Sequence, residues 1–156
     1  MDSNFQTLPH ICTYMASFVA NGAYILEPTK GIGNLVKALE LKGTVYAPRD
    51  FFSMPHQRFD WIVANPPFSP MQQGYDILYQ CMEMSDHLIF LLPWLSLINS
   101  SKRTQAIKKF GLKSVTHLPR NAFQGSRVQT CILEMAKDYK GKTDLLFYDL
   151  LETEGQ

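Results

Sequence analysis

Short apolar runs, each ended by a glycine, a proline or a polar residue, alternate with longer segments whose apolar residues recur at helical spacing. The runs expected to be buried strands are 24–26, 44–47, 61–64 and 88–92. The segments expected to be helices are 9–19, 34–41, 71–84 and 101–110. This alternation predicts an α/β fold with a mainly parallel sheet. Three more strands, expected at 115–118, 130–135 and 145–148, follow with no obvious helix between them, so we expect an antiparallel edge.

Length and composition restrict the class of protein. The 156 residues fit one domain, and we expect no second one. Hydrophobic residues make up 46% and charged residues 19%, which is typical of a globular chain. The net charge of +1 does not by itself indicate a nucleic-acid partner. No apolar run is long enough to span a bilayer, so we expect no membrane association.

The cysteines and histidines do not predict a metal site. Cys12, Cys81 and Cys131 are far apart and form no CxxC pair, which argues against both zinc and a disulfide framework. The four histidines are isolated along the chain. We therefore expect buried, reduced thiols, no bound metal and a cytoplasmic, intracellular location.

A glycine-containing loop, residues 27–33, joins the first expected strand to a helix. Glycines at the carboxyl end of a strand let the backbone approach a ligand closely. The loop has neither the dinucleotide fingerprint G-x-G-x-x-G nor the G-K-[ST] ending of a P-loop. Glu27 would repel a phosphate and suits an amine-bearing ligand. An ordinary strand–glycine–helix turn without a ligand remains the alternative.

A second constellation, Asn65-Pro66-Pro67-Phe68, ends the strand 61–64. The two prolines stiffen the backbone and remove two N–H donors, which leaves an amide side chain, free carbonyls and an aromatic ring. Hydrogen bonds from a planar amine to the Asn65 oxygen and the Pro66 carbonyl would localise the nitrogen lone pair and stabilise the positive charge that develops during attack. Phe68 could stack on the ring that carries the amine. These residues favour methylation of an amino group; a proline-rich strand end with no chemistry is the alternative.

Together the two constellations resemble the Rossmann-like class I S-adenosylmethionine (SAM)-dependent methyltransferases, and within them the adenine-N6 DNA methyltransferases. Residues 27–33 are similar to that family's E-P-x-x-G-x-G cofactor loop, and residues 65–68 to its N-P-P-F catalytic motif. Three weaker similarities are the segment 5–9, the acid–aromatic pair Asp50-Phe51 and the loop 118–123. The order of the two motifs excludes the permuted branch of the family.

The resemblance implies roles for individual residues. The catalytic residues would be Asn65, Pro66, Pro67 and Phe68. The residues expected to bind SAM are Phe5, Thr7, Glu27, Pro28, Thr29, Gly31, Gly33, Asp50, Phe51 and Asn65. Phe68, Arg120 and Arg127 would contact the substrate, a nucleic acid and most simply DNA, with the target base flipped out of the duplex. Another basic group is expected on a solvated helix face: Lys102, Arg103, Lys108 and Lys109.

Two departures from the family pattern leave alternatives open. The family usually has an acid after the second strand that binds the ribose of SAM, but residues 45–48 contain none. Either Asp50 takes that role or the second and third strands are trimmed. There is also no room for a separate target-recognition domain, so sequence-specific recognition would need a homodimer, a partner subunit or short loops. An RNA or protein-glutamine methyltransferase and a non-catalytic binding subunit are the competing functions.

Overall fold

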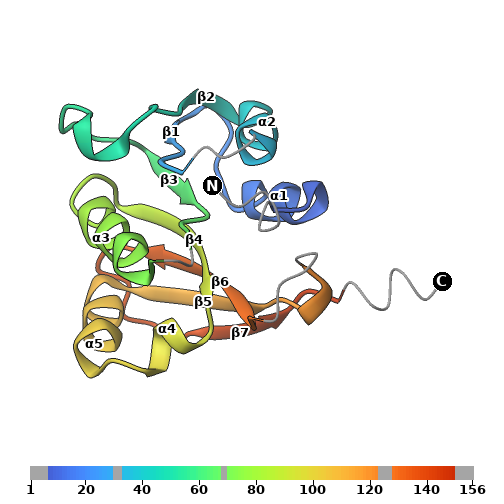
Figure 1. Cartoon of the computed structure of the whole chain (residues 1–156), viewed down its shortest axis with the longest axis vertical. Coiled ribbons are helices and arrows are strands. Elements are labelled where there is room, and N and C mark those ends of the chain that lie inside the picture. Colours follow the sequence, from blue (N-terminus) through green and yellow to red (C-terminus); the bar gives the residue numbers. More distant parts are fainter. Residues whose placement is uncertain (1–6, 30–32, 68–69, 123–127, 150–156) are drawn as a thin grey trace.

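The computed structural model describes residues 7–29, 33–67, 70–122 and 128–149 (Figure 1). Of the expected site residues, Phe5, Gly31, Phe68 and Arg127 lie outside these ranges. The strands are β1 (Ala23–Leu26), β2 (Gly43–Tyr46), β3 (Trp61–Ala64), β4 (His87–Pro93), β5 (Leu112–His117), β6 (Thr130–Ala136) and β7 (Asp144–Phe147). The helices are α1 (Pro9–Ala16), α2 (Asn34–Glu40), α3 (Met71–Cys81), α4 (Leu95–Ile98) and α5 (Ser101–Phe110), with short 3-10 turns η2 (Phe51–Ser53) and η3 (Arg120–Ala122).

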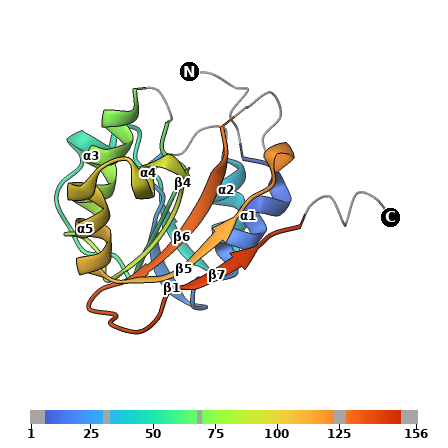
Figure 2. The ribbon, with the colours of Figure 1, turned by 90° about the horizontal axis from the view of Figure 1, so that it is seen from below.

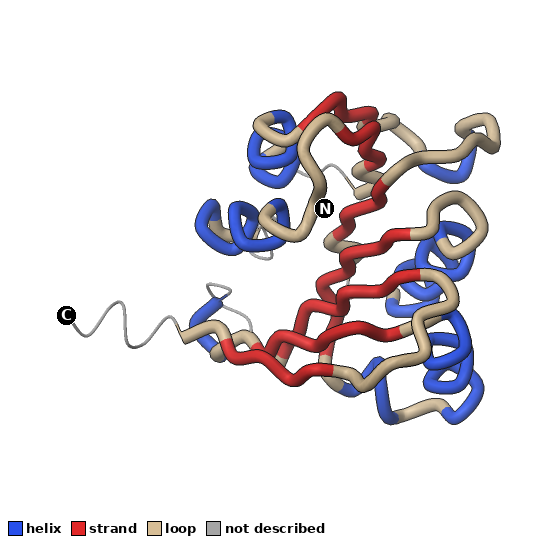
Figure 3. The backbone as a smooth tube through the Cα atoms, turned by 180° about the vertical axis from the view of Figure 1, so that it is seen from behind, coloured by secondary structure: helices blue, strands red, loops and turns tan. Residues whose placement is uncertain are grey.

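One mixed sheet of seven strands, in the order β2-β1-β3-β4-β6-β5-β7, runs through the molecule (Figure 3). The pairs among β2, β1, β3 and β4 are parallel, and β7 is parallel to β5. Strand β6 is antiparallel to both β4 and β5. The expected mainly parallel α/β fold is confirmed. The antiparallel strand, however, lies between β4 and β5, and the two edges of the sheet are β2 and β7.

Helices cover both faces of the sheet, with α1 and α2 on one side and α3, α4 and α5 on the other (Figure 2). Ile11, Met15 and Leu39 from the first pair pack on Val63 and Ile89 of the sheet. The residues that fill the core on the other side include Ile62, Ile77, Leu78, Phe90, Ile107 and Leu133. Alternate residues of β3 and β4 therefore enter opposite cores, as the two-residue period of a strand requires.

The segment between α2 and β3 is shortened, as one of the two sequence alternatives proposed. Residues 33–67 are all described, and they contain only one strand before β3, the edge strand β2. In place of a further strand and helix, residues 47–60 form an irregular connection with the turn η2. Asp50 caps this turn by accepting hydrogen bonds from the Phe52 backbone N–H (3.2 Å) and the Ser53 hydroxyl (2.6 Å).

One sequence expectation is wrong in the α5 region. Arg103 was expected on a solvated helix face, but it is buried, with 8% of its surface exposed. Its guanidinium lies over the Tyr75 ring, 3.6 Å from the centroid, and donates to the Ser96 carbonyl at 2.9 Å and the Asn99 amide oxygen at 2.7 Å. These acceptors belong to α4 and the residue after it, an element that the sequence did not predict. Across the described residues, none of the helices has the length and apolar character needed to cross a membrane.

Candidate functional site

Two loops meet at the carboxyl edge of the sheet, which is the side on which its parallel strands end, because their strands are neighbours. Strand β1 pairs in parallel with β3, with Ile25 opposite Trp61 and Leu26 opposite Ile62. Parallel strands end at the same edge, so residues 27–29 and 65–67 leave the sheet side by side. The two loops therefore lie together at the place where ligands bind in open α/β sheets.

Thr29 connects the two loops through one hydroxyl group. Its Oγ1 donates to Glu27 Oε2 at 2.6 Å and accepts from the backbone N–H of Asn65 at 3.0 Å. The Thr29 backbone N–H also donates to Glu27 Oε2, at 2.6 Å. A hydroxyl can donate and accept at once, so a single side chain fixes the spacing between the carboxylate and the Asn65 backbone.

Thr7 closes the cluster from the segment before α1. The Asn65 side chain donates from Nδ2 to the Thr7 hydroxyl oxygen. The Thr7 carbonyl accepts from Asn34 Nδ2 at 3.2 Å and from the Cys12 thiol at 3.7 Å. Because Asn65 uses its nitrogen on Thr7, its side-chain oxygen is the atom that can accept from a substrate.

Asn34 is a member of this cluster that the sequence reasoning missed. It is the first residue of α2, directly after Gly33, which adopts a left-handed conformation with φ 95°. The available sequence signal was an amide side chain at the first position of a helix that follows a glycine loop. A side chain at that position stays close to the loop.

Glu27 is a buried acid, with only 1% of its surface exposed. Its negative charge acts on two buried thiols, Cys12 in one core and Cys81 in the other. Burial, and to a smaller extent the charge of Glu27, raises the pKa of Cys12 from 9.0 to about 12. The same two causes, in the same order, raise the pKa of Cys81. A carboxylate held in such surroundings favours a neighbouring cationic group.

Asp50 and Phe51 lie on the connection that follows β2. The Asp50 side chain is exposed and caps η2, whereas Phe51 is buried in the same apolar cluster as Leu26. Phe52, with 46% of its surface exposed, is the aromatic ring of this segment that faces solvent. The ring contact between the two phenylalanines is edge-on, at 5.3 Å between centroids.

The remaining expected site residues are distributed as follows. Pro28 and Pro66 are buried and Pro67 is half-buried beside them in the two loops. Arg120 is exposed in η3, which follows the carboxyl end of β5. Since β5 runs parallel to β4, Arg120 lies toward the same edge of the sheet as Asn65.

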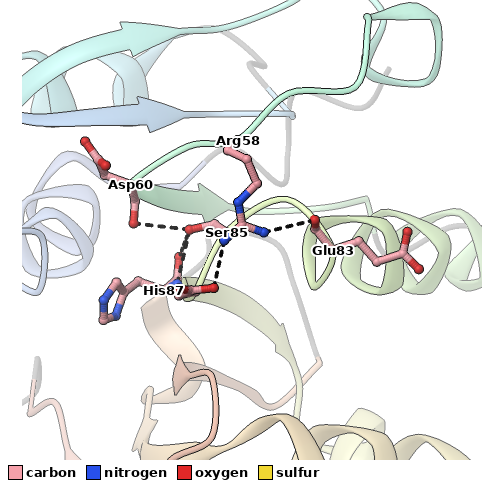
Figure 4. Close-up of polar contacts among 6 residues, drawn as sticks. Arg58, Asp60, Glu83, Ser85 and His87 are labelled. Carbon is pink, nitrogen blue, oxygen red and sulfur yellow. Dashed lines mark hydrogen bonds and ion pairs between the residues drawn. The ribbon is translucent and has the colours of Figure 1, made fainter.

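An open pocket of about 430 Å³ lies at the opposite edge, where β3 and β4 begin. It is lined by Arg58, Phe59, Asp60, Trp61, Asp86 and His87. Ser85 donates to the carbonyls of Asp60 (3.1 Å) and His87 (3.2 Å), and Arg58 donates to the Glu83 carbonyl (3.2 Å; Figure 4). These bonds join the loop ends to one another and give Ser85 and Arg58 a structural role. The candidate site that the sequence motifs indicate is at the carboxyl edge.

Metal ligands are not grouped at either edge. In the ranges 7–29, 33–67, 70–122 and 128–149 there is no cluster of three or more histidines, cysteines or acids able to hold a metal ion. The chemistry available at the carboxyl edge is therefore that of a buried carboxylate, hydroxyls, an amide oxygen and proline-flanked carbonyls.

No family model and no curated protein matches the sequence. Solved structures do match its fold. A candidate class I SAM-dependent methyltransferase from Listeria monocytogenes aligns with a TM-score of 0.70 at 18% identity, over 96% of this chain and 67% of that one. A type I restriction-modification methyltransferase subunit from Streptococcus thermophilus aligns with a TM-score of 0.72 at 14% identity, over 92% and 47%. A dimethyladenosine transferase from Plasmodium falciparum aligns at 0.60 and 16%, over 86% and 63%.

These likenesses establish the Rossmann-like methyltransferase fold. The chain spans about half the length of the restriction-modification subunits that it matches.

Proposed function

We propose that this chain is a SAM-dependent methyltransferase that methylates an amino group, with the N6 amine of adenine in DNA as its target. The observation that carries the proposal is the Thr29 hydroxyl bridge. It holds a buried carboxylate on the glycine loop and the Asn-Pro-Pro tip in one cluster. A cofactor and a planar amine need such adjoining sites if a methyl group is to pass directly between them.

The residues present fit SAM. Glu27 is buried at the end of β1 and suits the ammonium of the methionine part. Thr7 belongs to the same cluster through its bond with Asn65. The left-handed Gly33 turns the chain into α2 without a side chain in the way, so the backbone can approach the ligand. Asp50, exposed on the connection that follows β2, would accept hydrogen bonds from the adenosine part. When bound, SAM would supply an electrophilic methyl group on a positively charged sulfur.

The acceptors at the end of β3 would activate the target nitrogen. Asn65 Oδ1 and the Pro66 carbonyl would each accept one N–H of the amine, which localises the nitrogen lone pair. The same dipoles would stabilise the positive charge on nitrogen as the new C–N bond forms, and the surplus proton would then leave to water. Thr7 orients this amide, because the Asn65 Nδ2 bond fixes which of its two ends faces the substrate.

DNA as the substrate is supported by two kinds of observation. The Asn-Pro-Pro-Phe sequence resembles the motif of adenine-N6 enzymes, and Phe68 suits nucleic-acid targets where protein-glutamine enzymes usually carry tyrosine. Among the structures of the same fold are modification subunits of type I restriction enzymes. Arg120, exposed toward the site edge, would contact the phosphate backbone. A second copy, a partner subunit or short loops of this chain would supply the reading of a target sequence.

A second candidate function is a non-catalytic binding subunit. It is favoured by the edge position of β2, whose end at residues 46–48 has no acid for the ribose of SAM. Weakened cofactor binding would be the physical consequence.

The test has two parts. Isothermal titration calorimetry with SAM separates an enzyme from a dead subunit. Transfer of labelled methyl groups to unmethylated DNA, to RNA and to a protein extract, followed by nucleoside analysis, identifies the polymer and the atom. We expect label on adenine N6 of DNA. Label confined to RNA or protein would change the substrate, and no SAM binding would leave only the binding-subunit function.

A further inference from the structure

Gly74 lies in the interior of α3, directly against the two prolines of the Asn-Pro-Pro tip. A methyl group built on its Cα would meet the Pro67 carbonyl oxygen at 3.1 Å, Pro66 Cβ at 3.4 Å and Pro66 Cγ at 3.8 Å. The first distance is shorter than ordinary van der Waals contact, so an alanine here requires a shift of a few tenths of an ångström. Glycine is the poorest helix former after proline, and at this position the close contact accounts for its presence.

Contacts of the residues next to Gly74 hold α3 and oppose this shift. The next residue, Tyr75, donates or accepts one hydrogen bond with Ser96 Oγ at 3.2 Å, and its ring lies 3.6 Å beneath the Arg103 guanidinium. Arg103 is in turn fixed by the Ser96 carbonyl and by Asn99. One turn further on, Leu78 is fully buried in the core. A side chain at position 74 would therefore displace the loop rather than α3.

We propose that Gly74 is a positioning residue for methyl transfer: its bare Cα lets α3 support the Pro66–Pro67 backbone at the height where the Asn65 and Pro66 oxygens receive the target amine. This inference rests on the proposed function. It assigns a role to a residue outside the two loops, and that role concerns the acceptor geometry alone. The three atoms nearest to a methyl group at position 74 all belong to Pro66 and Pro67, and none belongs to Glu27 or Thr29 on the cofactor side.

The test compares Gly74→Ala with Gln73→Ala, in which an exposed neighbour on the same helix is also replaced by alanine. For each protein we would measure kcat and KM for methyl transfer to unmethylated DNA, the Kd for SAM by calorimetry, and the thermal midpoint. In Gly74→Ala we expect kcat to fall on the order of tenfold. Misplacement of the reacting groups by about 1 Å costs about a hundredfold, and the shift expected here is a few tenths of an ångström. The Kd for SAM should stay within about twofold and the thermal midpoint should stay level or rise, since alanine favours the helix.

The outcomes separate this inference from the function on which it rests. Equal kcat values for Gly74→Ala and Gln73→Ala, both active, would overturn the role of Gly74 and leave the proposed function intact. A parallel loss of thermal midpoint, SAM affinity and kcat, or failure of the variant to fold, would assign Gly74 a general packing role and also overturn it. No transfer by the wild type to any polymer would overturn the proposed function and this inference together.

Discussion

Replacement of Thr29 by valine removes the hydroxyl that joins the two loops while keeping the shape of the side chain. Two hydrogen bonds disappear: the donation to Glu27 Oε2 at 2.6 Å and the acceptance from the Asn65 N–H at 3.0 Å. The bond to a carboxylate contributes about 1.5–3 kcal/mol, and the half-buried N–H left without its acceptor costs about 1 kcal/mol. Because Thr29 is only half-buried, water recovers part of this, and we expect the free energy of unfolding to fall by about 2–3 kcal/mol.

Two matched variants make the measurement specific. Thr29→Ser keeps the hydroxyl and should change the free energy of unfolding by less than about 1 kcal/mol. Thr13→Val removes an exposed hydroxyl that only bonds the Pro9 carbonyl within α1, and should change it by about 0.5 kcal/mol or less. Urea denaturation followed by far-ultraviolet circular dichroism gives all three values. A Thr29→Val protein as stable as Thr29→Ser would refute the idea that the bridge holds the loops together, whatever the enzyme does.

Three further outcomes are expected. Asn65→Ala should lower kcat by at least about a hundredfold and leave the Kd for SAM within a few fold, since it removes an acceptor for the amine; equal losses would contradict its role. Arg103→Lys should lower the free energy of unfolding by about 2 kcal/mol in urea denaturation, because lysine cannot reproduce the planar stack on Tyr75 with two directed donors; an unchanged value would count against that stack. Burial raises the pKa of the Cys12, Cys81 and Cys131 thiols above 9.0 in the folded state, so the folded chain retains protons that the unfolded chain loses. The free energy of unfolding should therefore fall above about pH 9, by about 1.4 kcal/mol per pH unit for each thiol. Urea titrations from pH 8 to 11 with no such slope would contradict this.

Elements that carry their own boundary signals could be predicted from the sequence. Helix α5 runs from Ser101 to Phe110 as expected, because Ser100 caps its start and Gly111, at φ 133°, ends it. Strand β3 likewise stops where Asn65 and the two prolines follow it.

Elements whose limits depend on distant contacts were less predictable. Helix α1 was expected to reach Val19 but ends at Ala16. Val19 is nevertheless buried, which shows that apolar spacing reports burial more directly than backbone conformation. The burial of Arg103 was not foreseen either, because it depends on Tyr75 from α3 and on the short helix α4, neither of which is a local signal.

The same distinction applies to the candidate site. The sequence puts residues 27–29 and 65–67 directly after strands of one mainly parallel sheet, so their position on the same side of that sheet was predictable. The atoms that join them were not, because a threonine hydroxyl, the Thr7 segment and Asn34 act across 27 to 58 residues of sequence. Side-chain partners at such separations are set by the tertiary fold and leave no periodic pattern.

The direction of the hydrogen bonds gives the cluster a polarity. The Asn65 N–H donates to Thr29, and Thr29 donates to Glu27, so the donors run in one direction and end on a buried negative charge. Bonds aligned in this way polarise one another and become stronger together than separately. The Asn-Pro-Pro tip is therefore fixed relative to Glu27, and in the proposed reaction its carbonyls would need little rearrangement when charge develops on an amine nitrogen. A site of this kind stabilises a transition state through dipoles already in place, which is the arrangement that amine methylation without a strong base requires.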